Sequence, residues 1–265
     1  MRDFLIVSLE AAQQAGKIIK ERIGTITNEE IIQKSISDYV TEVDVLAEKT
    51  IIDHIKKSFP SHQIMAEESS NDYKKAEYLW IIDPLDGTTN FIHGFPVVAI
   101  SIALMYKGEL VLGVVHDPIR QEIFYAEKNG GAFLNGRKIK VSSTKLPELS
   151  LIATGFPFRN KQYIDPYIKI FRELLFSVSD LRRPGAAAID LAYVASGRVD
   201  GFFEFSLSPW DIAAGIVLIK EAGGCVSDFE GKEEYLKTGN IIAGNPLIHS
   251  FLVKKVKDTL GGIDG

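Results

Sequence analysis

Two things are scarce in this 265-residue sequence: cysteine and positive charge. The single Cys225 excludes a framework of intramolecular disulfides and suits a reducing compartment. Thirty-five acidic residues against 30 basic ones leave a formal net charge of −5 at pH 7. This balance offers no positive field to nucleic acid or to an anionic membrane surface, so we expect no direct nucleic-acid binding.

Long hydrophobic runs and metal-binding histidine patterns are also missing. The longest apolar stretch, residues 97–106, is about half of what a membrane-spanning helix needs. The N-terminal residues read as an amphipathic helix rather than as a signal peptide. The five histidines are scattered without ligand spacing, and no repeat or Pro/Ser-rich linker divides the chain. We therefore expect a cytoplasmic protein without membrane contact.

The first half of the sequence predicts helices followed by a meander of strands. Apolar residues recur at helical spacing over residues 3–23 and 42–58. The run Tyr-Leu-Trp-Ile-Ile at residues 78–82 is typical of a strand buried on both faces. Further strands are expected at residues 63–66, 97–106, 110–116 and 123–127. Asn135-Gly136 is the strongest hairpin signal, because both turn positions need positive φ.

Beyond Ser142 the pattern changes to alternating strands and helices. Strands are expected at 151–154, 181–183 and 199–205, and helices near 162–177 and 186–196. Ser208-Pro209 and Asn245-Pro246 have the cap and first-turn residues that open a helix. We therefore predict an α/β (α+β) protein with an N-terminal α+β portion, residues 1–142, and a C-terminal α/β portion, residues 143–265.

The strongest chemical signal is an acidic turn at the end of the buried strand, Asp83-Pro84-Leu85-Asp86-Gly87-Thr88. Two carboxylates this close repel each other unless a cation lies between them. Oxygen ligands of this kind suit Mg²⁺ or Mn²⁺ better than zinc. An Asp-rich surface turn with self-capping side chains is the structural alternative, but the buried strand that leads into this turn favours a functional site.

Three other acids are ambiguous on their own. Asp211 lies in the first turn of a helix, where a carboxylate complements the helix dipole. Glu67 follows a short strand and would pass for an ordinary loop residue. Asp44 fits a capping box that begins at Thr41. Each of the three has a sufficient structural explanation when it is considered alone.

Taken together, these pieces resemble the inositol monophosphatase family, most closely its bacterial branch, over essentially the whole length. The motifs that carry the resemblance are Glu67-Glu68-Ser69, residues 80–91 around the acidic turn, Gly130-Gly131-Ala132-Phe133, residues 182–204, and Trp210-Asp211-Ile212-Ala213-Ala214. The resemblance implies a layered αβαβα sugar-phosphatase fold, a homodimer, and inhibition by lithium.

The resemblance also implies a set of site residues. Two to three Mg²⁺ ions, with Mn²⁺ as a possible substitute, would be held by Glu67, Asp83, the Leu85 carbonyl, Asp86 and Asp211. Asp44 and Thr88 would hydrogen-bond to each other and position the attacking water, with Glu67 as a further catalytic residue. Substrate contacts would come from Asp86, Gly87, Thr88, Ala187, Glu204 and Asp211, and Lys34 matches a lysine in a loop near the site.

The implied activity is hydrolysis of myo-inositol 1-phosphate or a similar polyol monophosphate by a metal-activated water. Fructose 1,6-bisphosphate and other small phosphomonoesters remain alternative substrates, since relatives with the same acidic motif act on them. A transcription-associated role through a protein partner is a second alternative, because some bacterial relatives have such a role. The sequence does not choose among these substrates and roles.

Overall fold

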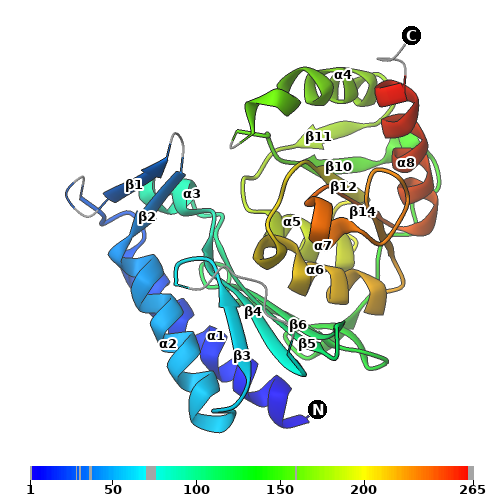
Figure 1. Cartoon of the computed structure of the whole chain (residues 1–265). Coiled ribbons are helices and arrows are strands. Elements are labelled where there is room, and N and C mark those ends of the chain that lie inside the picture. Colours follow the sequence, from blue (N-terminus) through cyan, green and yellow to red (C-terminus); the bar gives the residue numbers. More distant parts are fainter. Residues whose placement is uncertain are drawn as a thin grey trace.

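Two β-sheets and three layers of helices alternate through the molecule in the order αβαβα (Figure 1). The computed structural model describes residues 2–27, 29, 31–35, 38–69, 76–158 and 160–261. The layered architecture predicted from the sequence is confirmed. Within these described residues, no helix is both long enough and apolar enough to cross a membrane.

The first sheet has seven strands in the order β3-β4-β5-β6-β7-β8-β9. They are β3 (Gln63–Ala66), β4 (Tyr78–Asp86), β5 (Ala99–Tyr106), β6 (Glu109–Asp117), β7 (Glu122–Glu127), β8 (Gly131–Leu134) and β9 (Arg137–Ile139). Only β3 pairs in parallel, with β4, and the rest form an antiparallel meander. The predicted hairpin turn is confirmed, since Asn135 and Gly136 have φ values of 47° and 80°.

Helices α1 (Arg2–Arg22) and α2 (Glu42–Ser58) cover the outer face of this sheet (Figure 1). Their apolar stripes include Ile19 and Ile51, which pack with Trp80 and Ile82 of β4 in one buried cluster. β4 is buried along almost its whole length because helices lie on both of its faces. The position of the acidic end of β4 is therefore fixed by the packing on both faces of the strand.

The second sheet has five strands in the order β11-β10-β12-β14-β13. They are β10 (Leu151–Thr154), β11 (Asp180–Arg182), β12 (Gly201–Glu204), β13 (Cys225–Ser227) and β14 (Ile241–Gly244). β10 runs parallel to both β11 and β12, whereas β14 is antiparallel to β12 and β13. Helices α4 (Ile164–Leu175) and α8 (Pro246–Gly261) pack on the far side of this sheet (Figure 1).

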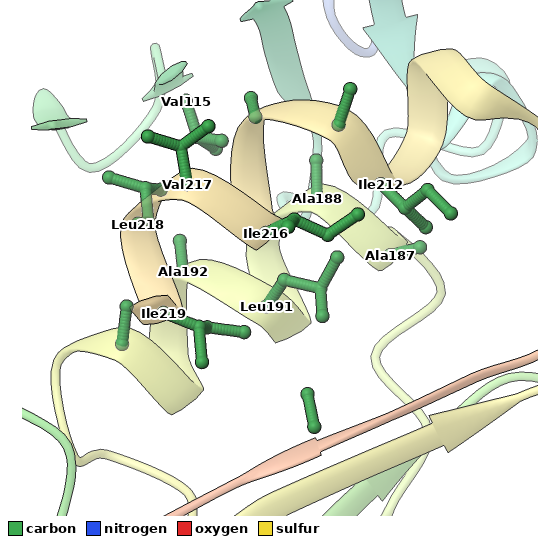
Figure 2. Close-up of a cluster of buried hydrophobic side chains, with 14 of the residues drawn as sticks. Val115, Ala187, Ala188, Leu191, Ala192, Ile212, Ile216, Val217, Leu218 and Ile219 are labelled. Carbon is green, nitrogen blue, oxygen red and sulfur yellow. The ribbon is translucent and has the colours of Figure 1, made fainter. Parts of the chain in front are cut away.

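Helices α5 (Ala187–Ala195) and α6 (Pro209–Glu221) form the middle layer between the two sheets. Figure 2 shows Ala188, Leu191 and Ala192 of α5 beside the apolar side chains of α6. The approach of α6 to the first sheet is very close at Gly113 of β6, where an added Cβ would lie 2.4 Å from the carbonyl oxygen of Ala214. Only glycine fits there, so α6 has one fixed depth against the first sheet.

Several short elements were not expected. A hairpin of β1 (Ile31–Ser35) and β2 (Asp38–Thr41) precedes α2. Strands β13 and β14, the one-turn helix α7 (Tyr235–Thr238) and the 3-10 turns η2 (Pro147–Leu149) and η3 (Lys161–Tyr163) also lie outside the predicted elements. All are short, and none carries the apolar periodicity on which the predictions depend.

Candidate active site

A pocket of about 240 Å³ opens where the acidic end of β4 meets α5, α6 and β12. Nine of the ten residues proposed from the sequence line it: Glu67, Asp83, Leu85, Asp86, Gly87, Thr88, Ala187, Glu204 and Asp211. The tenth, Asp44, reaches the pocket wall through a hydrogen bond to Thr88. Other lining residues come from the loop after β10 and from residues 183–186. The side chain of Lys34 lies outside what the structure describes.

The acidic turn is a bulge in the first sheet. Asp83 pairs with Ser101 of β5 and Asp86 with Ala99, so β4 carries one more residue than its partner strand between these two pairs. Pro84 lies in the bulge, where its missing N–H costs no ladder hydrogen bond. Gly87 follows with φ of 89° and begins the short helix α3 (Thr88–Ile92). The bulge turns the two carboxylates towards one pocket.

Asp83 is the most deeply buried of the four acids Glu67, Asp83, Asp86 and Asp211, with 1% of its surface exposed. Its Oδ1 accepts a hydrogen bond from the Leu85 N–H at 3.0 Å. Burial raises the pKa of the Asp83 carboxyl well above its usual range, and the neighbouring charges of Glu67, Asp86 and Asp211 raise it further. Four carboxylates from three segments, the end of β4, the loop after β3 and the start of α6, thus contribute to one electrostatic field.

Asp86 connects the first sheet to helix α5 of the middle layer. Its Oδ2 accepts a hydrogen bond of 2.7 Å from the N–H of Ala188, in the first turn of α5. The residue that precedes α5, Ala186, has no side-chain group that can cap the helix. Asp86 therefore takes the place of an N-cap for α5 from across the interface, where the helix dipole favours a carboxylate.

Asp44 and Asp211 occupy equivalent positions at the start of their helices. Asp44 is the third residue of α2 and forms a capping box with Thr41, as predicted from the sequence. Asp211 is the third residue of α6 and forms a capping box with Ser208. Each carboxylate is held rigidly by the backbone N–H of its N-cap residue. Two helices from different layers thus point the acid of their first turn towards the same region.

Thr88 joins Asp44 to the acidic turn. Its hydroxyl lies 3.0 Å from Asp44 Oδ1 and 3.1 Å from the carbonyl oxygen of Leu85. The hydrogen bond expected from the family resemblance is present. Burial raises the pKa of Asp44, and hydrogen bonds from Thr41 and Thr88 oppose that rise. Asp44 is thus a buried acid whose orientation is set by two threonine hydroxyls.

Glu67 lies directly after β3, where its N–H donates to the carbonyl oxygen of Ile82 in β4. The next residue, Glu68, donates its N–H to the Glu48 carboxylate of α2 at 2.8 Å. These two backbone contacts fix the start of the loop after β3. They place Glu67 on the pocket wall, within electrostatic reach of Asp83.

The donor set fits a hard divalent cation. Glu67, Asp83, Asp86, Asp211 and the Leu85 carbonyl offer only oxygen, and the mutual charge of the acids calls for positive compensation. Across the described ranges, however, no three His, Cys, Asp or Glu side chains stand close enough to enclose one ion. Asp83, Asp86 and Asp211 accept hydrogen bonds from backbone N–H groups, which hold the orientations of their carboxyl groups.

The other end of the pocket is built by the second sheet. Glu204, at the end of β12, is 7% exposed, and its carboxylate lies where a Cβ on Gly155 would be, 2.0 Å from Oε1. Gly155 therefore leaves the space that the Glu204 carboxylate occupies. Arg183 is the basic residue among the described lining residues, and its guanidinium lies 4.8 Å from the ring centre of Phe156.

Asp190 of α5 is a site residue that the sequence reasoning missed. It lines the pocket and is 1% exposed, and its Oδ1 has no hydrogen-bond partner among the described residues. Burial raises the pKa of Asp190 well above its usual range, and Glu204 and Asp86 add to the rise. The signal was present in the sequence, since Asp190 is the one charged residue in the otherwise apolar helix 186–196.

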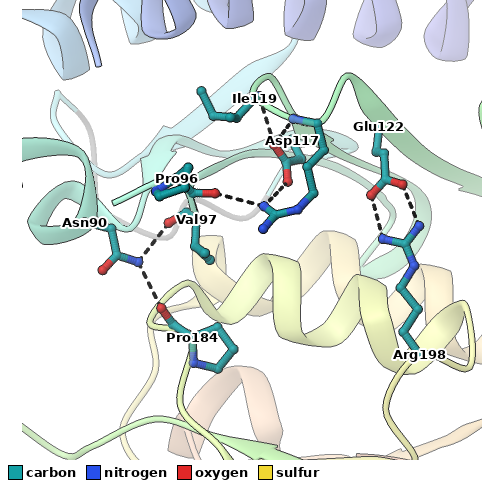
Figure 3. A network of polar contacts seen from close by, with 9 residues as sticks. Asn90, Pro96, Val97, Asp117, Ile119, Glu122, Pro184 and Arg198 are labelled. Atoms are coloured by element: carbon teal, nitrogen blue, oxygen red, sulfur yellow. Dashed lines mark hydrogen bonds and ion pairs between the residues drawn. The ribbon is translucent and has the colours of Figure 1, made fainter. Parts of the chain in front are cut away.

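The walls of the pocket are connected beneath it by polar contacts. In Figure 3, the Asn90 side chain donates to the carbonyl oxygens of Val97 and Pro184, at 2.8 and 3.0 Å. This ties α3, directly after the acidic turn, to the segment that leads into α5. Ser101 of β5 also donates its hydroxyl to the Trp210 carbonyl oxygen, next to Asp211. The relative positions of the acids are thus set by tertiary contacts.

Comparison with known proteins finds relatives that match almost the whole chain. The Nus factor SuhB of Pseudomonas aeruginosa is 49% identical over 265 residues, covering 98% of each chain. The extragenic suppressor protein suhB of Bartonella henselae has a TM-score of 0.92 at 42% identity, over 96% of this chain and 98% of that one. An IMPase of Thermotoga maritima has a TM-score of 0.90 at 41% identity, over 98% and 99%. The model of the inositol monophosphatase family matches residues 1–260, and the chain therefore belongs to that family.

Proposed function

We propose that this protein is a Mg²⁺-dependent phosphomonoesterase that hydrolyses myo-inositol 1-phosphate or a closely similar polyol monophosphate. The observation that carries the proposal is the group of four carboxylates, Glu67, Asp83, Asp86 and Asp211, that face one pocket and share one field. Such a group needs cations to bind an anionic phosphate ester. Membership in the inositol monophosphatase family supports the same reaction class.

We assign the metal ligands as Glu67, Asp83, Asp86, Asp211 and the Leu85 carbonyl. Two to three Mg²⁺ ions, or Mn²⁺ in their place, would supply Lewis-acid activation of the attacking water and charge compensation for the phosphate and the leaving alkoxide. Asp44 and Thr88 form a buried hydrogen-bonded pair at the pocket wall, which suits a role in orienting that water and accepting its proton. The Gly87 and Thr88 amides begin α3 and would contact the phosphate.

The alcohol half of the substrate would face Glu204 and the backbone at Ala187. A carboxylate accepts hydrogen bonds from hydroxyl groups, and Glu204 is buried in a space that Gly155 leaves open. An acidic subsite of this kind favours an alcohol with several hydroxyl groups over a purely apolar one. This favours a polyol phosphate among the possible phosphomonoesters.

The test is a substrate panel with the full-length chain, with Mg²⁺ and with a chelator in its place. We expect phosphate release from myo-inositol 1-phosphate that depends on Mg²⁺ and is inhibited by millimolar Li⁺. Fructose 1,6-bisphosphate, histidinol phosphate and 3′-phosphoadenosine 5′-phosphate are the alternatives to compare by kcat/KM. If no small phosphomonoester is hydrolysed at any Mg²⁺ concentration, the proposed activity is wrong.

A second candidate function is a transcription-associated role through a protein partner. The observation that favours it is the 49% identity over 98% of both chains to a protein named Nus factor SuhB. The decisive comparison is complementation of a strain that lacks the protein, using wild type and Asp83→Asn. Restoration of growth by an Asp83→Asn protein with no phosphatase activity would support the partner role, and failure to restore growth would support catalysis.

We propose three further properties of the protein: its division into two portions, its oligomeric state and its location. The division into residues 1–142 and 143–265 is one, and it predicts that neither portion is active alone because the pocket takes acids from both. A homodimer is the second, which light scattering at micromolar concentration would test. The third is a cytoplasmic location without direct nucleic-acid binding, for which an electrophoretic shift assay at physiological salt is the check on the binding part.

A further inference from the structure

Asp190 has a chemical environment that the fold alone does not explain. It belongs to the first turn of α5, is 1% exposed and borders the pocket. Its Oδ1 is buried and has no hydrogen-bond partner among the described residues. Buried carboxyl oxygens in folded proteins are almost always partnered, since leaving one unpartnered costs free energy.

The charged groups around Asp190 do not give it a structural partner. Glu204 of β12 and Asp86 of β4 are both acids, and both disfavour a second negative charge nearby. Among the described residues, Arg183 in the segment before α5 is the cation that acts on Asp190, and it is exposed and stacked over Phe156. An uncompensated acid in this position lowers stability rather than raising it, and such costs persist where function depends on them.

The contacts made by the neighbours of Asp190 indicate a role in substrate binding. Two residues earlier on α5, Ala188 donates its N–H to Asp86, and opposite it the Glu204 carboxylate occupies the space over Gly155. Three carboxyl groups from three elements, Asp86, Asp190 and Glu204, therefore lie close together at the pocket, and Asp86 is also one of the proposed metal ligands. The terminal torsion of an aspartate is soft, so a small rotation of the Asp190 carboxyl turns either oxygen towards the pocket.

We propose that Asp190 is a specificity-determining residue of the alcohol subsite, where it accepts a hydrogen bond from a substrate hydroxyl beside those accepted by Asp86 and Glu204. The inference rests on the proposed phosphomonoesterase function and narrows its substrate class to alcohols with several neighbouring hydroxyl donors. A carboxyl oxygen accepts in either protonation state, so the role does not depend on the charge of Asp190.

The experiment compares Asp190→Ala and Asp190→Asn with wild type in Mg²⁺. The substrates are myo-inositol 1-phosphate, glycerol 2-phosphate and 4-nitrophenyl phosphate, the last of which has no hydroxyl on its alcohol half. We expect Asp190→Ala to lower kcat/KM for the inositol substrate about tenfold relative to 4-nitrophenyl phosphate, mainly through KM. Asp190→Asn keeps an acceptor oxygen and should recover most of that ratio.

Melting temperature separates this role from a structural one. Removal of a costly unpartnered acid should leave the Tm of Asp190→Ala unchanged or higher, whereas loss of a structural group would lower it. The matched control is Asp165→Ala, which removes an exposed acid from the first turn of α4 and should change neither the ratio nor Tm noticeably.

Each result has a definite meaning. Equal loss of all three substrates in Asp190→Ala, or an unchanged ratio, overturns the inference. If wild type hydrolyses 4-nitrophenyl phosphate but prefers neither hydroxylated substrate over it, the polyol subsite is wrong while the phosphomonoesterase stands. If none of the three esters is hydrolysed, the proposed function itself fails, and this inference fails with it.

Discussion

The two ends of the pocket are built by different means. At the proposed metal end, formed by the acids around Asp83, Asp83 accepts from the N–H of Leu85, and Asp44 and Asp211 accept from the N-cap residues of their own helices. These hydrogen bonds join residues two or three positions apart. At the proposed alcohol end, Gly155 leaves the space that the Glu204 carboxylate occupies, and one oxygen of Asp190 has no hydrogen-bond partner among the described residues. The orientation of the acids at the proposed metal end is thus set largely within their own segments, whereas the proposed alcohol end depends on how distant segments pack.

This difference predicts that changes at the metal end affect all substrates alike, while changes at the alcohol end alter the choice among them. The largest effect is expected from Asp83→Asn. Loss of the most buried of the four acids should lower kcat by about 10³-fold for every substrate, since metal assistance contributes several kcal/mol to the barrier. Phosphate release at saturating Mg²⁺ measures it.

The same variant should have the opposite effect on stability without metal. Asp83 is buried among three other acids, so removal of its charge relieves repulsion in the folded state. In a chelating buffer we expect the Tm of Asp83→Asn to rise by about 3 °C, and Mg²⁺ should stabilise it less than it stabilises wild type. A lower Tm in chelator would mean that the charge of Asp83 stabilises the fold and that repulsion among the acids is not the dominant effect.

A smaller uniform loss is expected from Thr88→Val. The substitution keeps the shape but removes the hydroxyl that bonds to Asp44 and to the Leu85 carbonyl. We expect kcat to fall about 10²-fold with little change in KM, in the range of a lost general base. Thr88→Ser restores the hydroxyl and should recover most of the rate. A serine variant as slow as the valine variant would show that the methyl packing matters instead.

At the alcohol end, Gly155→Ala should change selectivity rather than chemistry. The new Cβ would take the space of the Glu204 carboxylate, which must move away. We expect kcat/KM for myo-inositol 1-phosphate to fall about tenfold while that for 4-nitrophenyl phosphate changes less than about twofold. Gly261→Ala is the control, because nothing lies within 4 Å of its added Cβ. An equal fall in kcat/KM for both substrates would contradict the proposed difference between the two ends of the pocket.

The smallest effect is expected from an ion pair that joins the two halves away from the pocket. Arg198, after α5, donates both guanidinium ends to Glu122 of β7, one of them at 2.6 Å (Figure 3). Both side chains are partly exposed, so Glu122→Gln should cost about 1 kcal/mol of stability or less and leave the phosphatase rate unchanged. A marked loss of phosphatase rate would show that this ion pair between β7 and the segment after α5 affects the active site.

The stability that the Arg198–Glu122 ion pair contributes depends on pH, and the direction of this dependence follows from the pKa of Glu122. The hydrogen bonds from Arg198 lower the pKa of Glu122 below its ordinary value of 4.5. The stabilisation is therefore fully present above about pH 5 and is lost as the pH falls through the lowered pKa. Thermal melts of wild type and Glu122→Gln should converge below pH 4, and a gap that stays constant into acid would contradict the assignment.

The local structure around the proposed metal ligands could be predicted from the sequence because its determinants lie within a few residues. The capping box at Asp44, the N-cap at Ser208 and the buried strand before Asp83 can all be recognised within a few residues. The family resemblance supplied the pairing of Asp44 with Thr88, whose hydrogen bond is present, and the ligand assignments stay predictions.

The alcohol end was harder to predict because its contacts cross the fold. The bond from Ala188 to Asp86 and the space left by Gly155 for Glu204 join segments that no short pattern connects. The β1–β2 hairpin was missed for a different reason. The residues between its strands, Ile36 and Ser37, include neither glycine nor asparagine, so the usual turn signal is absent.

The close contact between Gly113 of β6 and Ala214 of α6 determines when activity can appear during folding. α6 carries Asp211, and its depth against the first sheet is set by the contact of Gly113 with Ala214. The site therefore cannot assemble before α6 has docked, however early the seven-stranded meander forms from its short-range contacts. Recovery of phosphatase activity after dilution from denaturant should lag behind recovery of far-ultraviolet circular dichroism, and the lag should lengthen in a Gly113→Ala chain.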